Sequence, residues 1–250
     1  VIYNWPSAQL TVGFVPDVFG GNRRAVESLQ AQTDAQRFQL EAEAVAQLQH
    51  PNIVQIHDVG EHNGRPFLSL EFVGGGELAS KIAGEPQPPD EAAELVETLS
   101  RAMHFAHQRN IIHRDLKPAN MIVRDGDPGQ VVLLDFGIAR ADFEREGKTR
   151  SHQFGTARYM APEQWLTNDV SPAVDIFALG ISIIEMVQGD WATRLPLRLA
   201  EYETARDVLV AGCRDPRWGM VWWRRLEALL QQMMAFEPGD RPDANEVQEV

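Results

Sequence analysis

The spacing of hydrophobic positions changes along the chain, and these changes predict the order of its elements. Between residues 33 and 49, apolar residues recur at helical spacing, which predicts an amphipathic helix. The apolar positions of this helix are Phe38, Ala42, Val45 and Leu48. Pro51 should end it, because the residue before a proline avoids helical dihedral angles. Two strands are expected next, over residues 53–60 and 66–73, with a turn at residues 62–64.

The rest of the chain has mostly helical spacing. Helices are predicted over residues 89–108, 174–188, 222–235 and 243–250, and a short buried strand over residues 131–134. The segment 174–188 is apolar on nearly all sides, which is typical of a helix surrounded by protein. It should therefore be the central helix of the helical part.

Three consecutive glycines at positions 74–76 mark the expected boundary between two lobes. Residues 1–30 are short apolar runs broken by Asn, Pro and Gly, which predicts strands and turns. We therefore expect an α+β protein with two lobes. The N-lobe would comprise residues 1–73, rich in strands with one helix, and the mainly helical C-lobe residues 74–250.

Composition excludes several classes of protein. The net charge is −13 and the pI is near 5.0, which argues against nucleic acid or an anionic membrane as the main partner. The one cysteine, Cys213, cannot form an internal disulfide, which fits a reducing compartment. The longest apolar run, near residues 177–187, is too short to cross a membrane. We expect a cytoplasmic protein, or the cytosolic domain of a longer, membrane-anchored one.

Two short stretches concentrate polar groups suited to phosphoryl transfer: HRDLKPAN at residues 113–120 and LLDFG at 133–137. Such a reaction needs a group to orient the attacking hydroxyl, cations to neutralise the phosphates, and ligands for those cations. Asp115 could accept a proton, and Lys117 could neutralise the transferred phosphate. Asn120 and Asp135 carry the hard oxygen atoms that magnesium prefers.

These stretches are followed by GTARYMAPE at residues 155–163, and the joint pattern resembles the eukaryotic-like Ser/Thr protein kinases of bacteria. The similarity runs from about residue 37 to residue 250. It implies a bilobal protein-kinase-like fold that uses ATP and Mg²⁺, with Mn²⁺ as an alternative metal. It also implies that Asp115 is the catalytic base, that Lys117 faces the phosphate, and that Asn120 and Asp135 bind the metal.

The resemblance implies further positions around the nucleotide and in regulation. Leu70 would be the gatekeeper, the backbones of Glu71 and Val73 would bind adenine, and Glu77 would lie near the ribose. The other residues implied at the nucleotide site are Gly13, Ala25, Glu41 on the regulatory helix, and Ile122.

Other positions would brace or regulate the C-lobe. Asp175 would support the catalytic loop, and Glu163 would pair with Arg241 to anchor the activation segment. Arg114 would receive a phosphate from that segment, with candidate acceptors Thr149 and Ser151. The alternative for these two is that they are ordinary polar loop residues. Lys117 and Thr156 resemble the Ser/Thr-specific pattern. The resemblance therefore implies protein substrates, and it is compatible with self-association for autophosphorylation.

The first thirty residues depart from the family pattern. The glycine-rich phosphate loop is best matched by TVGFVPDV, where only Gly13 falls on a glycine position. Glu27 takes the position of the lysine that should bind the phosphates, opposite Glu41. No lysine precedes Lys81, and Arg23 is the nearest cationic substitute.

Three functions therefore remain to be compared. One is an active Ser/Thr kinase, and the second is a pseudokinase that acts as a nucleotide-binding or scaffolding module. The third, a small-molecule phosphotransferase, is disfavoured by GTARYMAPE, which resembles a peptide-docking activation segment. A separate feature is RWGMVWWRR at residues 217–225, whose tryptophans and arginines indicate either packing at the base of the C-lobe or a docking surface.

Overall fold

The computed structural model describes residues 35–62, 65–136, 158–166, 170–189, 206–208, 210–211 and 220–248. The chain divides into two compact units, residues 1–37 and 38–250, and nearly all described residues belong to the second. It has the mixed helix and strand content of an α+β protein. Several predicted positions lie outside the described residues; these are Gly13, Ala25, Glu27, Thr149, Ser151 and Thr156. The predicted lobe boundary after residue 73 stays a prediction.

The first described element is helical over residues 35–46, within the predicted range. Its buried positions are Ala42 and Val45, with Leu48 buried just beyond its end, as the spacing predicted. A turn at Pro51 comes after this helix. The His50 ring stabilises the turn, because its Nδ1 atom accepts a hydrogen bond from the Asn52 amide at 3.1 Å. The apolar stripe thus explains which face of this helix packs. The helix ends at residue 46, four residues before His50, so Pro51 excludes a continuation past His50 but does not set the observed end.

The two strands predicted next form an antiparallel hairpin of β1 (Ile56–His62) and β2 (Arg65–Leu70). Ile56 pairs with Leu70 and Val59 with Leu68, and the register shifts between Ile56 and Asp58. A bulge of this kind bends the strand locally. After β2, the Glu71 amide donates to the Gln55 carbonyl at 2.9 Å, which extends the pairing by one residue.

A second, three-stranded sheet has the order β3 (Gly76–Glu77), β4 (Met121–Val123) and β5 (Val131–Leu133). All three strands are antiparallel to their neighbours. The segment after the first helix joins this sheet through a parallel bridge between Ile53 and Leu133. The Asn52 side chain also donates to the Val131 carbonyl at 2.7 Å.

Two helices form the centre of the helical part, α3 (Pro89–His107) and α7 (Ala173–Gln188). Nearly every residue of α7 is buried, including Phe177 and Leu179, as its apolar sequence predicted. Asp90 and Glu91 lie in the first turn of α3, where carboxylates favour the helix dipole.

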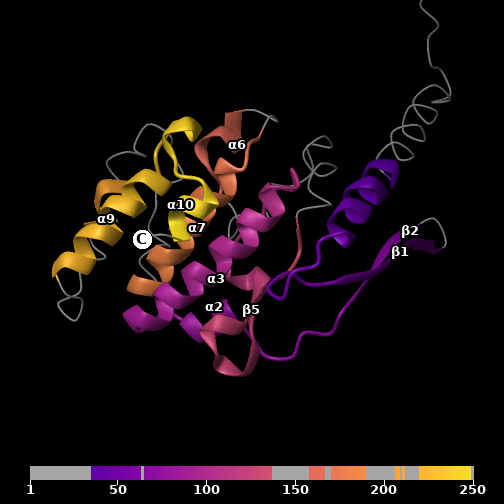
Figure 1. Ribbon diagram of the computed structural model, residues 1–250, viewed down its shortest axis with the longest axis horizontal. Coiled ribbons are helices and arrows are strands. Elements are labelled where there is room, and N and C mark those ends of the chain that lie inside the picture. The colour runs from indigo at the N-terminus through magenta and orange to yellow at the C-terminus, as the bar shows by residue number, and fades with distance from the viewer. Residues whose placement is uncertain are drawn as a thin grey trace, which may run out of the picture. The chain divides into compact units, whose positions relative to one another are not determined.

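Four further helices surround these two: α2 (Leu78–Ile82), α6 (Pro162–Leu166), α9 (Met220–Met233) and α10 (Ala244–Gln248). α10 and β5 contact α3, and α9 contacts α7 (Figure 1). Short 3-10 turns are found at Pro118–Asn120, Arg124–Gly126, Pro128–Gln130 and Pro238–Asp240. Among the described helices, none combines the length and apolar character needed to span a bilayer.

Replacing Gly75 with Ala should lower the free energy of unfolding by about 1–3 kcal/mol. Gly75 has a φ angle of 129°, and a Cβ atom there would lie 2.4 Å from the Val123 carbonyl oxygen. At Gly76, no described atom would lie within 4 Å of an added Cβ. Urea denaturation of Gly75→Ala and of the control Gly76→Ala measures both effects. Equal stability of the two variants would contradict the close approach of Gly75 to β4.

Candidate active site

The hairpin of β4 and β5 brings two predicted metal ligands to one end of the sheet. Met121 pairs with Leu133 in antiparallel register. Asn120 precedes β4, and Asp135 follows β5 after one intervening residue, Leu134. The Leu134 amide donates to the Asn120 carbonyl at 2.8 Å, which ties the two ends together. Residues far apart in sequence therefore meet because the strands between them pair.

Asp115, Lys117 and Asn120 form one hydrogen-bonded cluster. Lys117 Nζ lies 2.9 Å from Asp115 Oδ2, and Asn120 Nδ2 donates to the same oxygen at 3.2 Å. Asn120 Nδ2 also donates to the Asp115 carbonyl at 2.9 Å. The Asp115 and Lys117 side chains are 16% and 20% exposed, so both are shielded yet accessible from solvent. The carboxylate is thereby oriented and sits beside a cation, which suits it to handle a hydroxyl close to a phosphate.

The loop that carries this cluster is held by Asp175, which lies in the first turn of α7 and is 1% exposed. Its carboxylate accepts the backbone amides of His113 and Arg114, each at 2.8 Å. His107, in the last turn of α3, adds a third bond, with Nε2 2.9 Å from Asp175 Oδ2. Hydrogen bonds of this charge-assisted kind are stronger than those between neutral groups. They fix the loop in a conformation in which Arg114 has a φ angle of 64°.

His113 joins the catalytic loop to the end of β5. Its Nε2 atom donates to the Leu134 carbonyl at 2.8 Å, and its Nδ1 atom accepts from the Asp115 amide at 3.3 Å. Complete burial lowers the pKa of His113, because the charged form would lose its hydration. The ring stacks at a tilt on Phe136, with centroids 4.6 Å apart. His113 is thus a neutral packing residue, and it links Asp115 to the segment that carries Asp135.

The donor set fits a magnesium ion. Asn120 uses its amide nitrogen towards Asp115, so its side-chain oxygen is the atom suited to a cation. Asp135 adds an exposed carboxylate and has a φ angle of 50°. Within the described residues, no group of three His, Cys, Asp or Glu side chains could enclose a metal. Magnesium commonly keeps waters and binds through one or two protein oxygens plus substrate phosphates, which matches these two ligands.

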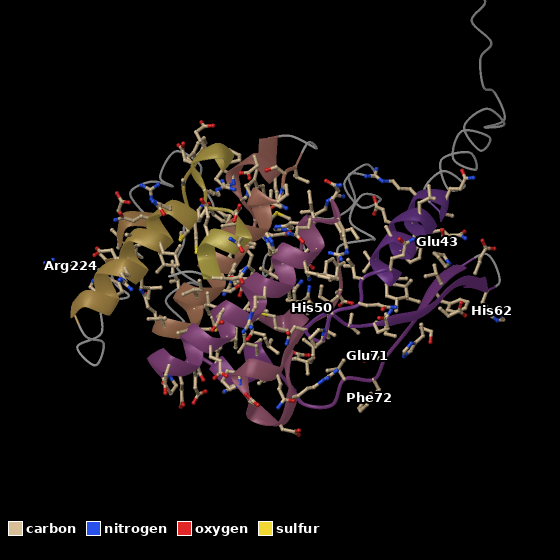
Figure 2. The ribbon with its side chains drawn as sticks, in the orientation of Figure 1. Glu43, His50, His62, Glu71, Phe72 and Arg224 are labelled. Carbon is tan, nitrogen blue, oxygen red and sulfur yellow. The ribbon has the colours of Figure 1, made fainter. Side chains whose placement is uncertain are left out.

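The predicted nucleotide residues lie on two neighbouring segments. Glu77 pairs directly with Ile122 in the β3–β4 ladder, so the structure brings these two together. Leu70 ends β2 with 40% of its surface exposed, and Val73 is half-buried. Glu71 and Phe72 lie on the segment that follows β2 (Figure 2).

Glu71 and Glu41 are two further residues predicted at the nucleotide site. The Glu71 side chain forms an ion pair with Arg124 at 3.2 Å, which connects that segment to the turn after β4. Glu41 is half-buried in the helical residues 35–46. Its predicted partner position, Glu27, lies outside the described residues.

The predicted pair of Glu163 and Arg241 is present and largely buried. Arg241 donates to the two Glu163 carboxylate oxygens at 2.6 and 2.9 Å, and the arginine side chain is completely buried. The guanidinium also donates to three backbone carbonyls, of Ala173, Ala235 and Phe236. This arrangement links α6 to the turns around α7 and α9.

The sequence did not predict three side-chain contacts, and two of them, those of His107 and Gln164, support the catalytic loop. His107 was part of the predicted helix over 89–108, with no signal of its contact to Asp175. Gln164 in α6 donates to the Arg114 carbonyl at 3.4 Å. The Tyr159 hydroxyl donates to Glu185 of α7. Burial, with the Glu185 carboxylate beside it, raises the pKa of Tyr159, so the phenol stays protonated.

Replacing Arg241 with Met should lower the free energy of unfolding by about 3–5 kcal/mol. The change removes the guanidinium from the Glu163 carboxylate and the donor from three carbonyls. Arg101→Met is the matched control, because Arg101 pairs with Glu97 at 3.2 Å where both side chains are 54% exposed. Such a surface pair contributes only about 0.5 kcal/mol. Similar losses for both variants, measured by urea denaturation, would contradict the anchoring role of Arg241.

Comparison with known proteins places this geometry in a family. The model of the family described as "Protein kinase domain" matches residues 23–250. The probable serine/threonine-protein kinase PknB of Lactococcus lactis is 42% identical over 154 residues, which are 61% of this chain and 24% of that protein. Serine/threonine-protein kinase PknA of Mycobacterium tuberculosis is 37% identical over 180 residues, 68% of this chain and 41% of that protein.

A solved structure agrees with these sequence matches. The crystal structure of the Mycobacterium tuberculosis PknI kinase domain matches with a TM-score of 0.62 and 26% identity, over 89% of this chain and 79% of that one. The chain spans about a quarter of the length of the first of these curated relatives and about two fifths of the second. Residues 11–18, where the glycine-rich loop was sought, lie outside the range matched by the family model. The resemblance found in the sequence is confirmed: this chain belongs to the protein kinase domain family.

Proposed function

We propose that this chain is a Ser/Thr protein kinase domain, which transfers the γ-phosphoryl group of ATP to a Ser or Thr hydroxyl of a protein. The observation that carries the proposal is the cluster of Asp115, Lys117 and Asn120 on a loop held by Asp175. Phosphoryl transfer depends mainly on positioning and on electrostatic stabilisation, and both are properties of this cluster.

Within this proposal, Asp115 orients the substrate hydroxyl and accepts its proton at a carboxylate oxygen. Lys117 Nζ lies 2.9 Å from that carboxylate, so it helps to orient the carboxylate and offers a positive charge to the transferred phosphate. Asn120 also holds Asp115, because its amide nitrogen donates to the Asp115 carboxylate and to the Asp115 backbone carbonyl. The neutral His113 ring keeps the Asp115 backbone in register with the segment that carries Asp135.

Asn120 and Asp135 would hold Mg²⁺ through their side-chain oxygens. The bound metal would supply positive charge against the phosphate oxygens of ATP. Mn²⁺ has the same preference for carboxylate and amide oxygens, and so is an alternative ion. The Glu77–Ile122 pair and the segment of Leu70, Glu71 and Val73 would border the nucleoside.

The proposal also covers regulation by phosphorylation and the location of the protein in the cell. Arg114 would receive a phosphate from Thr149 or Ser151, while Thr156 would contribute to Ser/Thr specificity and protein docking. Self-association would allow autophosphorylation. A single cysteine and the acidic charge support a cytoplasmic setting, either alone or as part of a membrane-anchored protein.

A pseudokinase is the second candidate, and one sequence observation favours it. Glu27 stands at the position of the phosphate-binding lysine, and no lysine precedes Lys81. The absence of that cation would slow transfer by orders of magnitude without preventing the fold. In that case the chain would act as a binding or scaffolding module.

Transfer of labelled phosphate from ATP with Mg²⁺, to the chain itself or to a basic protein, tests the proposal. Asp115→Asn should reduce transfer at least about 100-fold, because it removes the proton acceptor but keeps the shape. Asp125→Asn is the control, since Asp125 is an exposed residue in the turn after β4. Undiminished labelling of Asp115→Asn would contradict the role of Asp115.

Absence of labelling in the unmodified chain as well would favour the pseudokinase. A thermal shift with ATP and Mg²⁺ then separates a nucleotide-binding module from one that binds no nucleotide. Ligand at 100 times its Kd stabilises the folded state by about 2.7 kcal/mol.

A further inference from the structure

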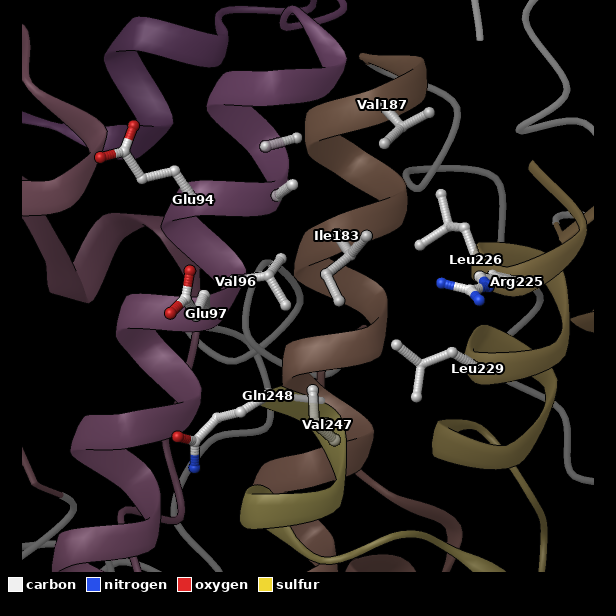
Figure 3. A pocket seen from close by; sticks show the side chains of 12 residues that line it. Glu94, Val96, Glu97, Ile183, Val187, Arg225, Leu226, Leu229, Val247 and Gln248 are labelled. Atoms are coloured by element: carbon white, nitrogen blue, oxygen red, sulfur yellow. The ribbon is translucent and has the colours of Figure 1, made fainter. Parts of the chain in front are cut away.

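A cavity of about 280 Å³ lies in the helical part of the fold, between α3, α7, α9 and α10 (Figure 3). It is separate from the catalytic loop: its walls come from the first half of α3, the second half of α7, and from α9 and α10. Six of the twelve lining residues have large aliphatic side chains: Val96, Ile183, Val187, Leu226, Leu229 and Val247. A mainly aliphatic lining of this kind favours an apolar ligand over water, because ordered water needs polar partners.

The cavity also has charged groups at its edge, and they are not equivalent. Glu94 is turned towards the turn Pro128–Gln130, where its Oε1 atom would lie 2.8 Å from a Cβ added to Gly129. Glu97 forms an ion pair with Arg101 along α3. Both carboxylates are therefore engaged or directed elsewhere.

Arg225 differs from these two carboxylates. It is exposed, it lines the cavity, and its side chain extends from α9 in the direction of α7 (Figure 3). Within the described part of the chain, its guanidinium has no ion-pair or hydrogen-bond partner. An arginine beside an aliphatic cavity presents a fork of donors that matches a carboxylate.

We propose that this cavity binds a medium-chain aliphatic carboxylate, with its chain among the aliphatic side chains and its carboxylate on Arg225. The volume suits this ligand, since a methylene group occupies about as much space as a water molecule, roughly 30 Å³, so that about nine fit. The site assigns a role to one part of RWGMVWWRR. Trp223 is buried, as expected for packing, whereas Arg225 is exposed and lines the cavity.

This inference is independent of phosphoryl transfer, because neither Asp115 nor any other residue of the catalytic loop lines the cavity. The test is therefore a binding measurement rather than an activity assay. Calorimetric titration of the whole chain with decanoate, below its micellar concentration, should give saturable binding and a higher melting temperature. Hexanoate should bind at least about tenfold more weakly, because each buried methylene strengthens binding about fourfold.

Arg225→Gln should weaken decanoate binding about two- to fivefold, the range expected for a partly exposed ion pair. Arg224→Gln is the matched control: Arg224 is also exposed on α9, and it does not line the cavity (Figure 2). Decylamine, with the same chain and the opposite charge, should bind more weakly than decanoate. Ala92→Leu should fill the cavity and abolish binding, and its melting temperature without ligand shows whether it folds.

Three results would overturn the proposal. Decanoate without saturable binding would leave the cavity to another occupant, such as an apolar peptide segment. Equal affinity in Arg225→Gln and the unmodified chain would show that the arginine does not bind the carboxylate. Decylamine that binds as tightly as decanoate would also show that Arg225 does not bind the carboxylate, and this comparison needs no variant.

Discussion

The buried carboxylate of Asp175 is the constraint on which the site depends. Removing a carboxylate from water costs several kcal/mol unless hydrogen bonds replace its hydration. Here the replacement comes from two backbone amides of the catalytic loop and from the His107 ring. The amides of His113 and Arg114 must therefore point at α7, and this direction fixes where the following residue, Asp115, can place its side chain.

A second constraint acts from the β4–β5 hairpin. Pairing of these strands brings Asn120 and the segment of Asp135 to one end, and the neutral His113 ring spans from that segment to the Asp115 backbone. The catalytic loop is thus held by the Asp175 carboxylate of α7 and by the segment that follows β5. The resulting cluster places the Asp115 carboxylate, the Lys117 ammonium group and the Asn120 amide close together, with Asp135 on the segment that follows β5. Rigid support of this kind is what phosphoryl transfer requires of a protein.

The sequence predicted much of this arrangement, because its strongest patterns are local. Apolar spacing identified α3, α7 and the hairpin of β1 and β2, and the family motifs identified the pair of Glu163 and Arg241 as well as the support from Asp175. The contacts of His107, Gln164 and Tyr159 were not predictable, since each depends on which helix faces which loop and none belongs to a repeated pattern. The same holds for the cavity at Arg225, which exists only because four helices leave a gap between them.

Amide hydrogen exchange at His113 and Arg114, compared between the unmodified chain and Asp175→Asn, tests the central claim most directly. An asparagine can accept one of the two amides through its oxygen but presents N–H groups to the other. The account predicts strong protection of both amides in the unmodified chain. In the variant their exchange should be much faster, while the amides of α9 exchange as before. Unchanged protection of His113 and Arg114 in Asp175→Asn would contradict the claim that this carboxylate holds the loop.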